Sequence, residues 1–166
     1  MFDTMTRFLA GVPDQETRQA LRRIVGPPLD RLSSQALTAA GLAINGAGAV
    51  FAKTGGAAFF ATAGGKLVTL AAGTALPALT GVAIPAGFFG VVCFFVDAGG
   101  VLTMAGGNPA ASLSGAGWPQ FPPGQALVGA LVITGGGVFT GGTTALDAAT
   151  TVYLSPVGAF DPTALA

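Results

Sequence analysis

Short hydrophobic runs separated by glycine-rich turns make up most of this chain after residue 46. Runs of this length, bounded by Gly and Pro, are typical of β-strands. Turn signals include Gly64-Gly65, Asp97-Ala98-Gly99-Gly100 and Gly135-Gly136-Gly137. The pattern predicts a mainly β body, an antiparallel β-sandwich. We expect strands at Ala47–Lys53, Ala57–Thr62, Lys66–Ala71, Phe88–Val96, Val101–Ala105, Ala126–Thr134 and Ala149–Leu154, with a short one near Leu79–Ile84 or Val138–Thr140.

The first 40 residues follow a helical period instead. Asp14 suits the start of a helix, and Gly26-Pro27-Pro28 ends it. Its apolar positions are Ala20, Leu21, Ile24 and Val25. A second short helix is expected to carry Leu29, Leu32 and Ala36 on one face. The sequence therefore predicts a short α-helical N-terminal arm, residues 1–40, on a β-sandwich body, residues 41–166.

Two of the expected strands are apolar on both faces. Phe88–Val96 and Ala126–Ile133 show no polar alternation, whereas an antiparallel sheet usually leaves one face to water. We therefore expect another subunit or the arm to cover the second face. The candidate core and subunit-interface residues are Phe88, Phe89, Val91, Phe94, Phe95, Trp118, Phe121 and Phe139.

A proline-rich segment precedes the strand expected at Ala126–Thr134. It reads Trp118-Pro119-Gln120-Phe121-Pro122-Pro123-Gly124, with three prolines between aromatic rings. A Pro-rich recognition ligand is one interpretation. The flanking rings favour the other, a stiff connection that crosses from one sheet to the other with its rings packed down.

Charge is concentrated at one end of the chain. Charged residues make up 8% of the sequence, against roughly 25% in an ordinary soluble domain, and the net charge is zero. Nine of the fourteen charged residues precede Leu32. The arm's arginines are Arg7, Arg18, Arg22, Arg23 and Arg31, our candidates for contacts with an acidic partner surface. Acids alternate with them, so the pattern disfavours nucleic-acid binding and favours protein assembly.

Catalytic patterns are missing from the sequence. It contains no histidine, and its single cysteine, Cys93, lies within an apolar run typical of an inert core thiol. Gly64-Gly65-Lys66 lacks the remaining residues of a phosphate-binding loop, since Leu67 stands where Ser or Thr is needed. Asp97 suits a turn carboxylate. We expect that the protein is not an enzyme and that it binds no metal, cofactor or small-molecule ligand.

High hydropathy raises the question of a membrane protein. Mean hydropathy is +0.69, and no charge interrupts residues 67–96. Pro77 and Pro85 break this stretch, and no Lys or Arg cluster flanks it. We therefore expect no membrane association, with a small holin-like phage membrane protein kept as an alternative.

Four segments, in this order, resemble a group of tailed-bacteriophage head decoration, cement or head-fibre proteins. The segments are Lys66–Thr74, Phe94–Gly100, the proline crossover leading to Gln125–Gly129, and Phe139–Asp147. The resemblance implies a jelly-roll-like body that forms a homotrimer on the outer surface of the capsid. It further implies bridging of major capsid protein subunits, synthesis in the cytoplasm of the bacterial host, and no catalytic residues. A tail or receptor-binding β module would share such a body and is the other alternative.

Overall fold

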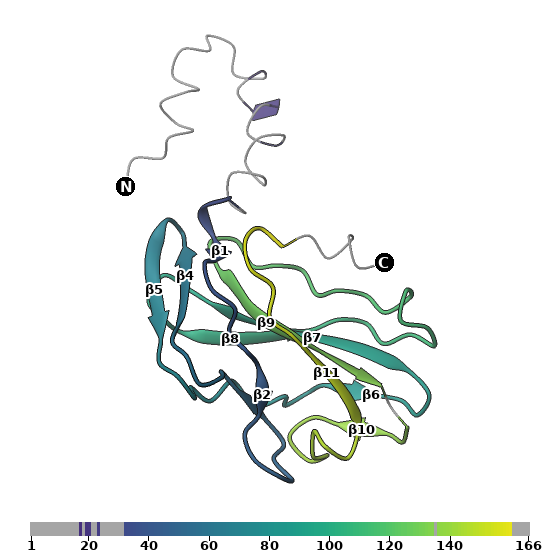
Figure 1. Cartoon of the computed structure of the whole chain (residues 1–166). Helices are drawn as coiled ribbons and strands as arrows, with labels where there is room; N and C mark the ends of the chain where they lie inside the picture. The colour runs from purple at the N-terminus through teal and green to yellow at the C-terminus, as the bar shows by residue number, and fades with distance from the viewer. Residues whose placement is uncertain (1–16, 18, 21–22, 24–31, 135, 161–166) are drawn as a thin grey trace.

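The computed structural model describes residues 17, 19–20, 23, 32–134 and 136–160. Within them the protein is mainly β, with four antiparallel sheets and very little helix (Figure 1). The predicted mainly β character is thus confirmed. Most of the predicted arm, including Arg7, Arg18, Arg22 and Arg31, lies outside the described residues.

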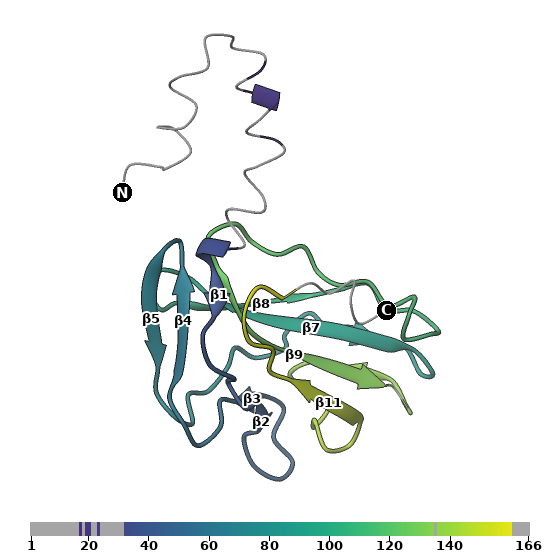
Figure 2. The same ribbon diagram turned by 45° about the horizontal axis from the view of Figure 1, so that its top comes forward.

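The largest sheet has four strands in the order β11-β9-β7-β8. These are β7 (Phe89–Val96), β8 (Leu102–Gly106), β9 (Ala126–Thr134) and β11 (Thr150–Leu154). Their bounds match the sequence-based ranges to within a residue at each end. Since β8 and β9 both pair antiparallel with β7, they run parallel to each other. The segment that joins them, residues 107–125, must therefore cross β7; we call it the crossover segment (Figure 2).

Asp97 closes the hairpin between β7 and β8, as its turn context predicts. Its carboxylate Oδ1 accepts the backbone N–H groups of Gly99, at 2.8 Å, and Val101, at 2.9 Å. The backbone N–H of Gly100 donates to the Asp97 carbonyl at 3.0 Å, and Gly100 has a φ of 82°. A left-handed glycine thus completes the turn.

Three smaller sheets pack against the large one. They are the sheet of β1 (Gln35–Ala36), β4 (Phe59–Ala63) and β5 (Lys66–Leu70), the pair β2 (Ala43–Ile44) and β3 (Ala52–Lys53), and the pair β6 (Ala83–Ile84) and β10 (Phe139–Thr140). The sequence left β6 and β10 as alternatives, whereas both exist and pair with each other. The long strand expected at Ala47–Lys53 is reduced to β3, and β1 and β2 were not predicted.

Residues 35–40 belong to the packed body, although the sequence boundary gave them to the arm. Ala36 pairs with Ala61 in β4 and is buried, and Ala40 is buried as well. The second short helix is therefore wrong for Ala36, which lies in a strand. Its small side chain fits the interior of the three-stranded sheet.

The main hydrophobic cluster lies between the four-stranded sheet and the smaller sheets. Phe59 from β4, Phe94 from β7, Leu131 and Ile133 from β9 and Phe139 from β10 are all fully buried in it. Strands β1 and β4 both contact β9, which places the two larger sheets against each other. The core thus joins segments that are distant in sequence.

A second cluster fills the opposite face of the four-stranded sheet. It contains Val91, Cys93, Phe95, Ala116, Leu127, Ala130 and Val132. Trp118 and Phe121 from the crossover segment, together with Phe160, pack against this second-face cluster. The expectation that another subunit or the arm covers this face is therefore wrong, because the chain covers it with its own crossover segment. The rings pack down as predicted, but the segment joins two strands of one sheet.

A β-bulge interrupts the pairing of β9 with β7. Phe94 pairs with Gly129 and Phe95 with Leu127, so Val128 is an extra residue. The position of Gly129 suits glycine alone. A Cβ there would lie 2.5 Å from the carbonyl oxygen of Leu154 and 2.6 Å from Leu42 Cδ1.

Candidate functional site

The eight aromatic and aliphatic candidates divide between the two clusters. Phe94 and Phe139 belong to the main cluster, with Phe88 packed against it. The second-face cluster and its cover contain Phe89, Val91, Phe95, Trp118 and Phe121. In the described structure these side chains hold one chain together and do not form an exposed subunit surface.

The crossover segment is held over β7 by both ring contacts and backbone pairing. The rings of Phe95 and Phe121 meet edge to face, with centroids 5.2 Å apart. Trp118 and Phe121 contact Phe160 with centroid distances of 5.2 and 6.3 Å. Phe89 and Ala110 exchange two backbone hydrogen bonds, of 2.7 and 3.0 Å. This cover is therefore an ordered part of the fold.

Of the five arginine candidates, the structure describes Arg23 alone. Arg23 is helical and exposed, as are Thr17, Gln19 and Ala20. The arginine set as a contact surface therefore stays a prediction.

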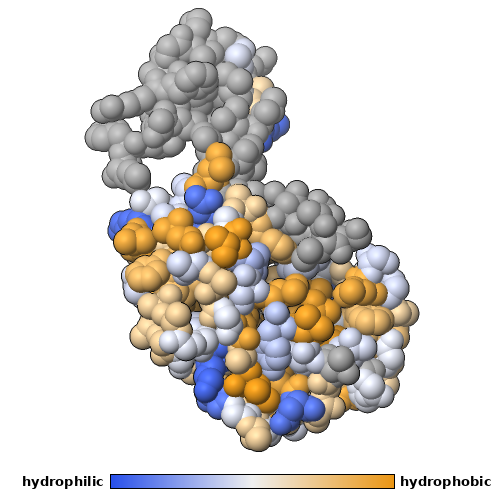
Figure 3. Space-filling view, in the orientation of Figure 1, coloured by the Kyte–Doolittle hydropathy of each residue, from blue (hydrophilic) through white to orange (hydrophobic). Residues whose placement is uncertain are grey.

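Exposed hydrophobic side chains gather on and beside the outer face of the sheet β1-β4-β5. Figure 3 shows this face, where orange side chains lie just below the start of the continuous chain. The side chains are Leu32, Leu37, Phe60 and Leu67, with exposed fractions of 59%, 44%, 39% and 66%. We call these four residues the outer apolar patch. The sequence pattern did not predict this patch, although Phe59-Phe60 and Leu67-Val68 each place apolar side chains on both faces of a strand.

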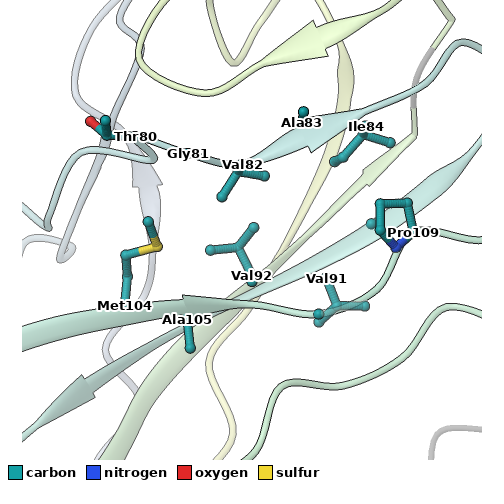
Figure 4. A pocket seen from close by; sticks show the side chains of 13 residues that line it. Thr80, Gly81, Val82, Ala83, Ile84, Val91, Val92, Met104, Ala105 and Pro109 are labelled. Atoms are coloured by element: carbon teal, nitrogen blue, oxygen red, sulfur yellow. The ribbon is translucent and has the colours of Figure 1, made fainter.

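A groove of about 360 Å³ opens between β6 and the edge of the large sheet (Figure 4). It is lined by residues 80–84, 90–92, 104–107 and Pro109. Its apolar walls are formed by Val82 just before β6, Ile84 in β6, Val92 in β7 and Met104 in β8. None of its lining residues has an ionisable side chain, and Thr80 carries the one side-chain hydroxyl among them.

The described residues contain no group of three or more His, Cys, Asp or Glu side chains that could hold a metal ion.

The carboxylate Oδ2 of Asp147 accepts the backbone N–H of Gly48 at 2.8 Å, which ties two loops together. Burial raises the pKa of Tyr153, and the negative charge of Asp147 raises it further. The carboxylates of Asp97 and Asp147 thus stabilise loops by accepting backbone hydrogen bonds.

Cys93 is fully buried in β7, where desolvation raises the pKa of its thiol to about 12. This rise from the ordinary thiol pKa of 9.0 lowers the thiolate fraction near neutral pH by roughly a thousandfold. We expect a maleimide to leave the native protein unlabelled and to label it fully in denaturant, as mass spectrometry would register. A Val138→Cys variant, exposed at residue 138, is the control and should label once in the native state. Rapid native labelling of Cys93 would contradict the buried strand assignment.

Comparison with protein-family models, with curated proteins and with solved structures found no match. In the part of the chain that the structure describes, no helix has the length and hydrophobicity needed to cross a membrane.

Proposed function

We propose that this chain is a non-enzymatic virion structural protein of a tailed bacteriophage, a capsid decoration or cement protein. It forms a homotrimer on the outer surface of the head and bridges neighbouring major capsid protein subunits. It is made in the cytoplasm of the bacterial host. Its body is a β-sandwich of jelly-roll-like arrangement, and its arm is α-helical.

The observation that carries the proposal is the division between a nearly uncharged body and a charged arm. Residues 32–160 contain only four charged side chains, Lys53, Lys66, Asp97 and Asp147. Both of these aspartates are engaged in loops. A surface so poor in charge favours close apolar contacts with other proteins. Four resembling sequence segments, of which Phe139–Asp147 is the most specific, point to the same class.

A cement protein stabilises a shell mechanically. Each copy contacts more than one capsid subunit, so the shell opens only if those contacts break as well. Many modest contacts on one lattice act together through effective concentration. Shape-matched apolar surface can supply them without an active site. The arginines of the arm would select acidic residues on the shell.

The arm's charge tests the proposal in the full-length protein. We expect Arg18→Glu/Arg22→Glu/Arg23→Glu to remain a trimer by light scattering and to lose at least about tenfold in occupancy of capsids, because like charges brought together oppose binding. Electron microscopy of capsids lacking the native protein measures the occupancy. Lys66→Glu, one charge reversal on the body, is the control and should coat capsids normally.

A shortened chain gives a second measurement. It should begin at Leu32, because Ala36 and Ala40 are part of the core. We expect trimers that do not coat capsids. Normal coating by both variants would disprove the arm's role. Full-length protein found only on tails would replace the head assignment with the tail module.

A further inference from the structure

The outer apolar patch includes Leu32, the residue at which the continuously described part of the chain begins. The backbone N–H of Gly65, at the hairpin tip, donates to the Ser33 carbonyl at 3.0 Å, which places Leu32 close to the start of β5. The N–H of Leu37 donates to the Phe60 carbonyl at 2.8 Å, so these two residues are neighbours. Phe60 pairs with Thr69 and Leu67 with Thr62, which puts Phe60 and Leu67 on the same face. The patch is therefore continuous across three strands and adjoins the arm.

The arm has an apolar stripe short enough to lie on the patch. Residues 20–25, as a helix, are about 9 Å long, and the five-residue strands β4 and β5 each extend about 17 Å. Six residues lie between Val25 and Leu32, and the seven Cα–Cα steps from one to the other allow a span of at most roughly 25 Å. Gly26-Pro27-Pro28 can turn the chain within that span. The stripe is thus tethered within reach of the patch.

We propose that the arm folds back and packs its apolar stripe, Ala20, Leu21, Ile24 and Val25, on the outer apolar patch of its own chain. Ala20 is exposed, as is the patch, so both surfaces have apolar area to bury. The short tether gives the arm a high effective concentration at the patch, which favours docking within one chain over docking on a second copy.

Docking determines which side of the arm remains accessible. With Leu21 and Ile24 against the sheet, Arg22 and Arg23 point away from the body. This presentation rests on the proposed function, in which the arginines meet acidic residues of the shell. The docking itself does not depend on the shell and can be measured in the free protein.

Trypsin can report the docking, because five of the chain's seven Lys and Arg residues lie in the arm. Leu67→Gln removes apolar surface from the centre of the patch. Because Leu67 is largely exposed, we expect the body to stay folded. Trypsin needs the arm's backbone to open locally, even though the arginine side chains face solvent in the docked helix, so cleavage after Arg22 and Arg23 should become about tenfold faster when docking is weakened. Val138→Gln is the control, with an exposed fraction of 67% far from the patch, and it should leave the rate unchanged. Equal rates in all three proteins would overturn the proposal.

A cross-link identifies the contact directly. Because Cys93 is buried, only introduced cysteines should react with a short bis-maleimide. Ile24→Cys/Leu67→Cys should yield an intramolecular link, seen as a compacted monomer on a denaturing gel and as a linked peptide by mass spectrometry. Ile24→Cys/Val138→Cys is the control and should yield none. Links only between chains, or none with Leu67→Cys, would reject docking within one chain.

The two proposals fail separately in these experiments. Protected arginines and an intramolecular link in a protein that never coats capsids would retain the docking and reject the capsid function. Normal coating by a protein whose arm is cleaved at the same rate in every variant would reject the docking alone.

Discussion

Replacing Phe95 by alanine is expected to lower the free energy of unfolding by about 3–5 kcal/mol. Phe95 is almost fully buried between the four-stranded sheet and the crossover segment, and its ring meets Phe121 edge to face. Truncation removes the transfer energy of the ring and leaves a cavity beneath Phe121. Urea unfolding measures the loss. Trp118, the only tryptophan, lies in the cover and reports its opening by fluorescence.

The matched control is Phe60→Ala in the outer apolar patch. Phe60 is exposed, so its truncation should lower the free energy of unfolding by no more than about 1 kcal/mol. Similar values for the two variants would mean that the crossover segment does not bury Phe95 in solution. That result would mean that another subunit covers the second face of the four-stranded sheet, as the sequence led us to expect.

Gly107→Ala is expected to be the second severe substitution, lowering the free energy of unfolding by about 3 kcal/mol, near the upper end for overpacking. A Cβ at residue 107 would overlap the carbonyl oxygen of Gly117 and lie 3.3 Å from the backbone nitrogen of Pro119. These neighbours are backbone atoms of the crossover segment and cannot rotate aside. The start of that segment passes its middle part, residues 117–119, at this glycine.

Gly106→Ala is the control for that substitution. A Cβ at Gly106 meets only Val82 Cγ2, at 3.4 Å. Alanine also restricts the unfolded chain, so we expect a change within about 1 kcal/mol. Thermal unfolding of the two variants side by side would measure the contrast. Equal stability at both positions would contradict the close passage.

The sequence predicted the long strands well because their signals are local. The apolar run Ala126–Thr134 is bounded by glycines, and β9 has those bounds. A local signal cannot predict that β6 pairs with β10, because the two strands are more than fifty residues apart in sequence. The two-residue strand β1 is defined by its pairing with β4 and resembles the end of a helix in sequence.

The cover over the second-face cluster was misassigned for a physical reason. Apolar residues on both faces of β7 require burial of both faces, but periodicity cannot say which segment supplies it. The answer depends on strand order, because β8 and β9 flank β7 and the connection must cross it. The rings of Trp118 and Phe121 correctly predicted a connection that packs against the body. The prediction that this connection crosses to a second sheet was wrong, because it joins two strands of one sheet.

The candidate surfaces were predictable in unequal measure. The inert setting of Cys93 and the turn role of Asp97 followed from their neighbours in sequence. The outer apolar patch did not, because Leu37 and Phe60 become neighbours only when β1 pairs with β4. The contact role of the arginines stays a prediction, to be tested on capsids.

The crossover segment also bears on the order of events during assembly. A subunit in which its own chain covers both faces of the central strands β7 and β9 can complete folding as a first-order process. Its core then forms at a rate independent of how many copies the cell has made. Under the proposed function, docking on capsid subunits is then a later step governed by concentration, so folded subunits can accumulate before the shell is finished.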